Sequence, residues 1–169
     1  MLPKLKNIVQ ISTVLLIICF NVFVVSAHLN RPTITIPLTK TAINPDSNFA
    51  YNAVIPKAYN HKWLYTLRSD NNEKPYQSTL VLLENNTPIG TPHAAHDDIR
   101  TNGSGKFSHW SYAIYFSTPD NSNPITNNKT YAVKIKLDIK PIYYDITYLL
   151  TFLLALFLLC SFKKITPKI

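Results

Sequence analysis

Residues 146–162 read Ile-Thr-Tyr-Leu-Leu-Thr-Phe-Leu-Leu-Ala-Leu-Phe-Leu-Leu-Cys-Ser-Phe, without a charged residue, a proline or a glycine. As a helix this stretch rises about 25 Å, close to the ~30 Å thickness of the hydrocarbon core of a bilayer. Tyr143 and Tyr144 precede it, where amphipathic rings favour the headgroup level, and Lys163 and Lys164 follow it directly. We therefore expect a transmembrane helix over 143–162, in contact with the lipid bilayer, and a cytoplasmic tail over 163–169.

A second apolar stretch, near the N-terminus, has the layout of a secretory signal peptide. Lys4 and Lys6 precede an apolar run over 8–25, and Val25-Ser26-Ala27 matches the small-residue pattern of a cleavage site. We expect residues 1–27 to be a cleaved signal peptide. The alternative is a retained signal anchor, because the run is long enough to span a membrane. In either case positive charge precedes the first run and follows the second, which predicts that residues 28–145 are exported.

Charge and cysteine content describe the exported part. The chain has 17 basic and 9 acidic residues, but five basic residues flank the apolar runs, which leaves 12 basic against 9 acidic residues between them. With no cluster of Lys and Arg there, we expect no nucleic-acid partner. Cys19 and Cys160 both lie in the apolar runs, so no disulfide can form in the exported part. These features favour a single-pass type I protein of a bacterial inner membrane, facing the periplasm or the exterior.

The exported part has the pattern of short strands joined by turns. The clearest strand is the last, in which apolar residues alternate with polar ones at Tyr131, Val133, Ile135, Leu137 and Ile139. Thr33-Ile34-Thr35-Ile36, between two prolines, suits an edge strand, and Asn85-Asn86 suits a tight turn between strands. We expect an all-β fold, an antiparallel β-sandwich of immunoglobulin-like size over 49–140, preceded by an extended segment over 28–48.

The densest polar cluster lies in an irregular stretch over 91–110. One hypothesis is a zinc or copper site, because histidine and carboxylate ligands suit these metals. Its ligands would be His93, His96, His109 and Asp97. The structural alternative is a solvated loop in which Asp97 and Asp98 cap turns and Arg100 pairs with one of them.

The same stretch and the loop over 117–129 also suggest a site for a sugar or another polar ligand. Trp110, Tyr112 and Tyr115 offer rings for stacking, and charged or amide side chains offer directional hydrogen bonds. The candidate ligand-binding residues are His96, Asp97, Asp98, Arg100, His109, Trp110, Asp120 and Asn121. The structural alternative is that Trp110 fills the core of the sandwich.

No nucleophile elbow or phosphate-binding glycine loop occurs in the sequence, so we expect neither catalysis nor a cofactor. The function we expect is that of a non-catalytic module, anchored at the membrane, that binds a glycan, a peptide or a membrane-protein partner. Two alternatives remain open at this point. One is the metal-binding protein described above, and the other is a small accessory subunit of a membrane complex.

Overall fold

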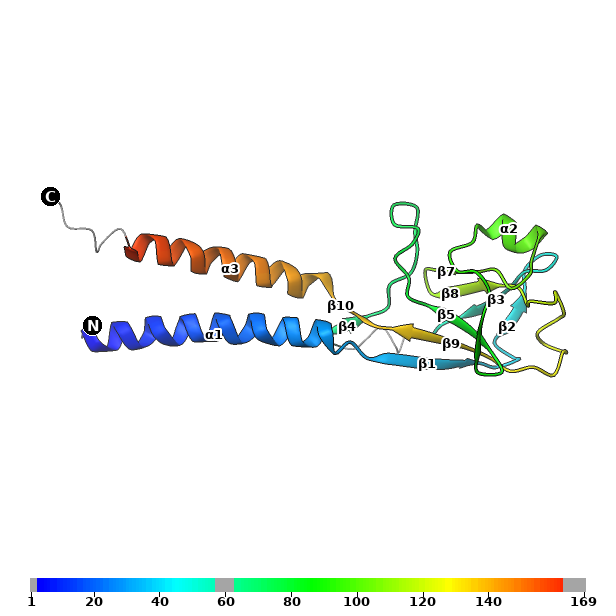
Figure 1. Ribbon diagram of the computed structural model, residues 1–169, viewed down its shortest axis with the longest axis horizontal. Coiled ribbons are helices and arrows are strands. Elements are labelled where there is room, and N and C mark those ends of the chain that lie inside the picture. The colour runs from blue at the N-terminus through cyan, green and yellow to red at the C-terminus, as the bar shows by residue number, and fades with distance from the viewer. Residues whose placement is uncertain (1–2, 57–62, 163–169) are drawn as a thin grey trace. The chain divides into compact units, whose positions relative to one another are not determined.

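The computed structural model describes residues 3–56 and 63–162, so the predicted tail over 163–169 lies outside the described residues. The chain divides into two compact units. A helical unit combines the two ends of the chain, and a β unit spans Pro32–Asp138. Figure 1 shows the elements of both units along the chain.

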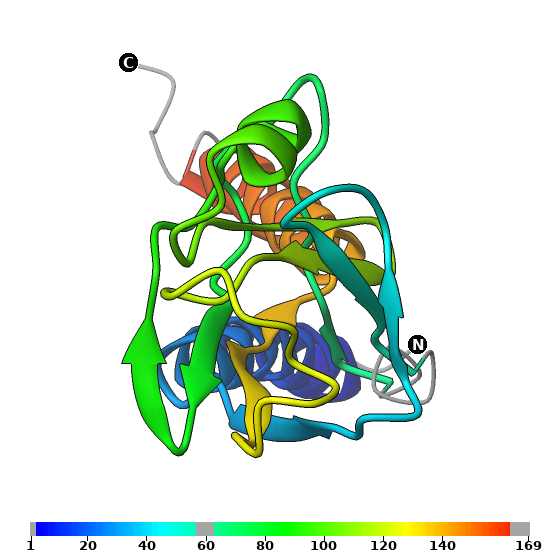
Figure 2. The same ribbon diagram turned by 90° about the vertical axis from the view of Figure 1, so that its right-hand side faces the viewer.

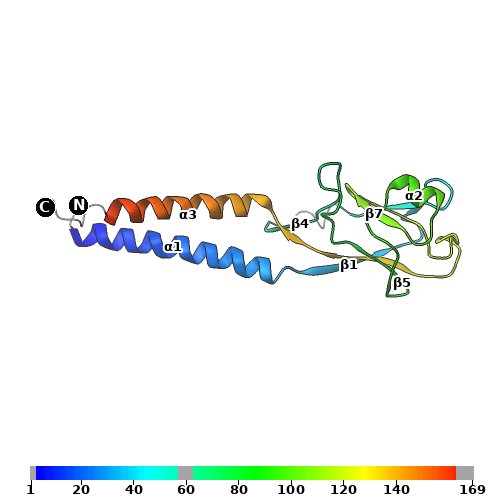
Figure 3. The ribbon, with the colours of Figure 1, turned by 45° about the horizontal axis from the view of Figure 1, so that its top comes forward.

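The helical unit consists of α1 (Pro3–Leu29) and α3 (Pro141–Phe162). Within α1 the segment Ile8–Leu29, and within α3 the segment Pro141–Cys160, are long and apolar enough to cross a membrane. The two helices lie side by side and antiparallel, as Figures 1 and 3 both show. Pro141 begins α3, a position at which proline costs no helical hydrogen bond.

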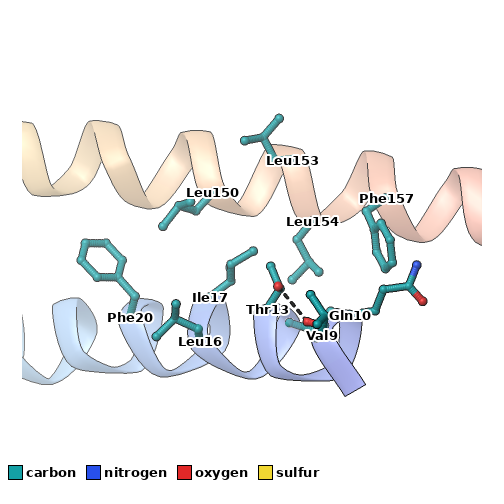
Figure 4. Close-up of a pocket in the computed structure, with 11 residues that line it drawn as sticks. Val9, Gln10, Thr13, Leu16, Ile17, Phe20, Leu150, Leu153, Leu154 and Phe157 are labelled. Atoms are coloured by element: carbon teal, nitrogen blue, oxygen red, sulfur yellow. Dashed lines mark hydrogen bonds between the residues drawn. The ribbon is translucent and has the colours of Figure 1, made fainter. Parts of the chain in front are cut away.

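An apolar groove of about 590 Å³ separates α1 and α3 along part of their length. Figure 4 shows the side chains that point towards it from both helices. They include Leu16, Ile17, Phe20, Leu150, Leu154 and Phe157. The two helices therefore contact each other along only part of their length.

The β unit contains two four-stranded antiparallel sheets. The first has the order β1-β9-β5-β6, formed by β1 (Thr33–Leu38), β9 (Tyr131–Lys136), β5 (Val81–Glu84) and β6 (Thr87–Ile89). The second has the order β2-β3-β8-β7, formed by β2 (Ile43–Pro45), β3 (Tyr51–Val54), β8 (Ala113–Phe116) and β7 (Phe107–Trp110). Among the described residues, β4 (Tyr65–Thr66) and β10 (Asp138–Ile139) form a separate two-stranded sheet.

One hydrophobic core joins the two four-stranded sheets. Leu82, Val133 and Ile135 from the first sheet and Ile114 and Phe116 from the second belong to the same buried cluster. The antiparallel β structure predicted from the sequence is thus present, and packing across two sheets is what a sandwich requires.

The alternation predicted for the last strand is confirmed. Tyr131, Val133 and Ile135 are buried in β9, whereas Lys134 and Lys136 are exposed. The strand lies inside its sheet, between β1 and β5. Its polar side chains therefore cover the outer face of the sheet.

The structure tests three local predictions, for an edge strand, a tight turn and an irregular stretch. The edge position predicted for Thr33–Ile36 is confirmed, because β1 is the first strand of its sheet. The turn at Asn85 and Asn86 is also confirmed, since both have positive φ, as a tight hairpin requires. The prediction that 91–110 is irregular was wrong over His96–Thr101, which forms the short helix α2, and over Phe107–Trp110, which forms strand β7.

The core face of β9 provides a test of the register. Val133→Asp should lower the free energy of unfolding by at least about 3 kcal/mol, because it places a carboxylate without a partner where no side-chain surface is exposed. Lys134→Asp, the neighbouring change on the exposed face, should cost less than about 0.5 kcal/mol. Urea denaturation of the full chain in detergent measures both, and equal losses would contradict the register.

Candidate functional site

The site is organised by β7, whose side chains alternate between two environments. Phe107 belongs to the hydrophobic core, and His109, two residues further on, is buried with it. Ser108 and Trp110 face the other way and line a pocket. Helix α2 lies over this sheet, beside β7 and β8, as the green helix in Figure 2 shows.

The chain before α2 is held against β7 by backbone hydrogen bonds. The amide of Phe107 donates to the carbonyl of Thr91 at 2.9 Å, and the amide of Ala94 donates to the carbonyl of Phe107 at 3.0 Å. Gly90 permits this approach, because a Cβ there would lie 1.6 Å from the carbonyl oxygen of Gly105. The result is that His93 and His96 lie beside the outward face of β7.

The pocket has a volume of about 520 Å³, within the usual range for small-molecule sites. It combines two imidazoles, the rings of a tyrosine and a tryptophan, one carboxylate and two hydroxyls, one of which belongs to the tyrosine. The residues that supply them are His93, His96, Tyr76, Trp110, Asp70 and Ser108. Tyr76 is largely exposed, so its ring forms part of the rim.

Asp70 is the buried polar centre behind the pocket. Its Oδ2 lies 2.7 Å from Nδ1 of His93, and its Oδ1 accepts a hydrogen bond of 2.9 Å from the amide of Ser78. The amide of Asp70 itself donates to the carbonyl of His109 at 2.8 Å. His93 has φ +59°, a conformation that non-glycine residues rarely adopt outside constrained positions. The Asp70 carboxylate thus fixes the orientation of the His93 ring.

His96 lies between two aromatic rings at the start of α2. Its ring stacks on that of Tyr115, with centroids 4.2 Å apart, and meets Trp110 edge to face at 5.7 Å. Burial lowers the pKa of His96, helped by the positive charge of Arg100. Nε2 of His96 is buried and has no hydrogen-bond partner in the described part of the chain. The hydrogen-bonding capacity of this nitrogen is therefore unused within the described residues.

His109 lies on the core side of β7 and does not line the pocket. Its Nδ1 lies 2.7 Å from the hydroxyl of Ser78, and only 2 % of the residue is exposed. Burial lowers the pKa of His109 to about 4, more than the nearby Asp70 carboxylate and the Arg68 carbonyl raise it. His109 therefore supports the wall of the pocket from behind and stays neutral at pH 7.

Three of the predicted ligand-binding residues form ion pairs on the surface. Arg100 contacts Oδ2 of Asp46 at 2.7 Å and Oδ1 of Asp97 at 3.0 Å, and of these two contacts the structural alternative predicts the one with Asp97. Asp98 accepts from Asn102 and from Lys106, and these hydrogen bonds lower its pKa. None of the three lines the pocket.

Asp120 and Asn121 lie in a separate turn. Asp120 accepts from Ser122 and from Lys129, and these contacts hold its pKa well below its usual range. Asn121 accepts from the amide of Ser104 at 2.7 Å, which ties its turn to the neighbouring loop. The structure thus gives both side chains local partners and does not bring them to the pocket.

The predicted metal ligands are only partly brought together. His93 and His96 line the same pocket, whereas His109 points to the core and Asp97 pairs with Arg100. Within residues 3–56 and 63–162, no three His, Cys, Asp or Glu side chains are grouped so that they could hold a metal ion.

The sequence did not reveal Asp70 and Tyr76, which line the pocket, or Ser78, which contacts Asp70 and His109 behind it. They belong to the polar stretch 69–78, about 15 to 40 residues before the other site residues, and no spacing links the two regions. Their position depends on the bridge between Asp70 and Trp110, a long-range contact that only the fold creates.

The buried His109 predicts a specific pH dependence. Its pKa is about 4 in the fold and 6.5 when exposed, so between these values the unfolded chain binds a proton that the folded chain does not. The free energy of unfolding should therefore fall as pH drops from 6.5 towards 4, by on the order of 3 kcal/mol in full. His96 adds to the same trend. Urea denaturation followed by tryptophan fluorescence reports on this unit, which contains both Trp63 and Trp110.

His109→Asn is the matched control for this measurement. The amide can still hydrogen-bond Ser78, but it takes up no proton in this pH range. The variant should therefore lose less stability than the unchanged protein as the solution is acidified. Parallel losses in the two proteins would show that another group is responsible.

No family model, curated protein or solved structure matches this chain. Function therefore has to be inferred from the chemistry of the pocket. That chemistry is two imidazoles and two aromatic rings around a buried carboxylate whose oxygens both have partners.

Proposed function

We propose that this chain is a membrane-anchored, non-catalytic binding protein whose β unit, a small sandwich of immunoglobulin-like size, takes a neutral, hydroxyl-rich ligand such as a glycan. The observation that carries the proposal is the pocket beside β7, where rings and hydrogen-bonding groups face the same space. Trp110 and Tyr76 supply the rings, and His93 and His96 supply the polar groups.

The polar groups of the pocket favour a neutral ligand. Among the residues described as lining it, there is no Lys or Arg, and Asp70 is the one acid. Both oxygens of Asp70 already accept hydrogen bonds within the fold, from His93 and from the amide of Ser78, which supports a structural role for this carboxylate. A neutral imidazole has one donor and one acceptor nitrogen, which suits hydroxyl groups, since these also donate and accept.

The aromatic rings supply the second part of sugar recognition. An aromatic ring offers a flat apolar face, and the apolar face of a sugar ring can pack on it while its hydroxyls reach polar side chains. Trp110 is half-buried, and His96 meets its indole edge to face. A ring in this position can exchange water for a ligand without unpacking the core.

The Ser78–His109 pair does not favour catalysis. Ser78 is 8 % exposed and is not among the residues that line the pocket. Its hydroxyl oxygen also lies 3.2 Å from the amide of Leu80, which suits a structural contact within the fold. We therefore propose that the pair maintains the shape of the pocket wall.

The anchor determines where such a module acts. In the part of the chain that the structure describes, two helices are long and apolar enough to cross a membrane, and lysines flank both on the side away from the β unit in the sequence. The positive-inside rule then favours an extracytoplasmic β unit. In that position the pocket would meet cell-surface or envelope glycans.

Binding of soluble neutral oligosaccharides by the full chain tests the proposal. The chain should be held in lipid nanodiscs or in a detergent without a sugar headgroup, because alkyl glycosides would compete for the pocket. Trp110→Ala should weaken binding at least about tenfold, a loss of ~1.4 kcal/mol. Tryptophan fluorescence and calorimetry across a panel of hexose and N-acetylhexosamine oligomers measure the affinity.

Tyr112→Ala is the matched control, since Tyr112 is a neighbouring exposed aromatic residue that does not line the pocket. It should bind as the unchanged protein does. Equal weakening of binding by Trp110→Ala and Tyr112→Ala would contradict a glycan site at Trp110. Absence of oligosaccharide binding by the unchanged protein would contradict it as well.

A further inference from the structure

We propose that α1 is not removed as a signal peptide but stays in the membrane as a second transmembrane helix, hydrogen-bonded to α3. The β unit would then be an insertion between two spans. This inference rests on the membrane anchoring proposed above, but not on the pocket or its ligand.

The first observation is that the cleavage pattern lies inside a helix. Val25-Ser26-Ala27 belongs to α1, which continues to Leu29. The carbonyl of Ser26 accepts from both the amide and the side-chain nitrogen of Asn30, at 3.0 and 2.9 Å. Ala27 is 9 % exposed, although it would precede the cut bond. Proteolysis acts on locally opened chain, so this hydrogen-bonded, covered turn opposes cleavage.

The second observation is a polar contact in the middle of the two helices. The hydroxyl of Thr151 lies 3.2 Å from Oδ1 of Asn21 and 2.8 Å from the carbonyl of Thr147, and it can donate to either. The side-chain nitrogen of Asn21 donates to the carbonyl of Ile17, which leaves Oδ1 directed at α3. An amide is costly to expose to lipid, so Asn21 favours a partner helix over an isolated span.

A third contact joins the ends of the helices that lead to the β unit. Nδ1 of His28 lies 2.6 Å from the hydroxyl of Tyr144, and the two rings meet edge to face with centroids 6.1 Å apart. His28 would become the first residue of a cleaved chain. Here it occupies the last turn of α1, where it has a fixed partner.

The strands on which the chain enters and leaves the β unit are compatible with a pairing of the two helices. Strand β1 begins four residues after the end of α1, and it pairs with β9 so that Thr33 lies opposite Lys136. The chain therefore enters and leaves the β unit on neighbouring strands. Lysines at both outer ends predict that both helices begin or end on the cytoplasmic side, as two antiparallel spans require.

The N-terminus of the membrane-bound protein tests the proposal directly. The full chain, with a tag at its C-terminus, should be isolated from membranes and analysed by intact mass and N-terminal sequencing. Unprocessed chain synthesised without membranes serves as the size standard. We expect the same mass, apart from loss of the initiator Met1. A mature N-terminus at His28 would overturn the proposal.

Cross-linking tests the contact between the helices independently of processing. In a background of Cys19→Ser and Cys160→Ser, the pair Asn21→Cys and Thr151→Cys should be joined by a short thiol-reactive cross-linker in membranes. The matched control is Val22→Cys with Phe152→Cys, adjacent positions that are exposed in the hairpin. We expect several-fold more product from the first pair. Equal yields from the two pairs would overturn the hairpin.

Discussion

The antiparallel pairing of β1 with β9 is the contact on which the rest of the structure depends. It runs from Thr33 opposite Lys136 to Leu38 opposite Tyr131, and so joins the beginning and the end of the β unit. The same strand β9 pairs with β5 on its other side and sends Val133 and Ile135 into the core shared by both sheets. One pairing therefore closes the domain, supports its core and brings together the attachment points of the two helices.

The second sheet carries the candidate site because β7 lies at its edge. An edge strand has one side free, and here that side receives the bridge to Asp70 and the backbone of Thr91 and Ala94. These contacts cover the strand, as an edge in a soluble sheet requires, and they also deliver His93 and Asp70 to the pocket. The contacts that protect β7 from edge pairing thus also assemble the pocket.

The sequence predicted the features that depend on local periodicity. The two apolar stretches, the alternation over 131–136 and the turn at Asn85–Asn86 follow from residue spacing alone, and the structure has them.

Of the predicted site residues, the structure brings His96 and Trp110 to the pocket, together with His93 from the metal hypothesis. Asp97, Asp98 and Arg100 looked equivalent in the sequence, but a polar side chain that pairs with a neighbour cannot be distinguished there from one that faces a ligand. Asp70 and Tyr76 could not be found, because long-range contacts determine their positions. Short helix α2 was missed because six residues are too few to establish a helical period.

The central claim is that the β unit lies on one side of a membrane and both outer ends of the chain lie on the other. Labelling with a membrane-impermeant thiol reagent in intact cells tests it, using single cysteines in a background without Cys19 and Cys160. Lys134→Cys, on the exposed face of β9, should be labelled in intact cells. Lys6→Cys and Lys164→Cys should be labelled only after the cells are permeabilised. Labelling of Lys6→Cys from outside, or protection of Lys134→Cys, would contradict the account.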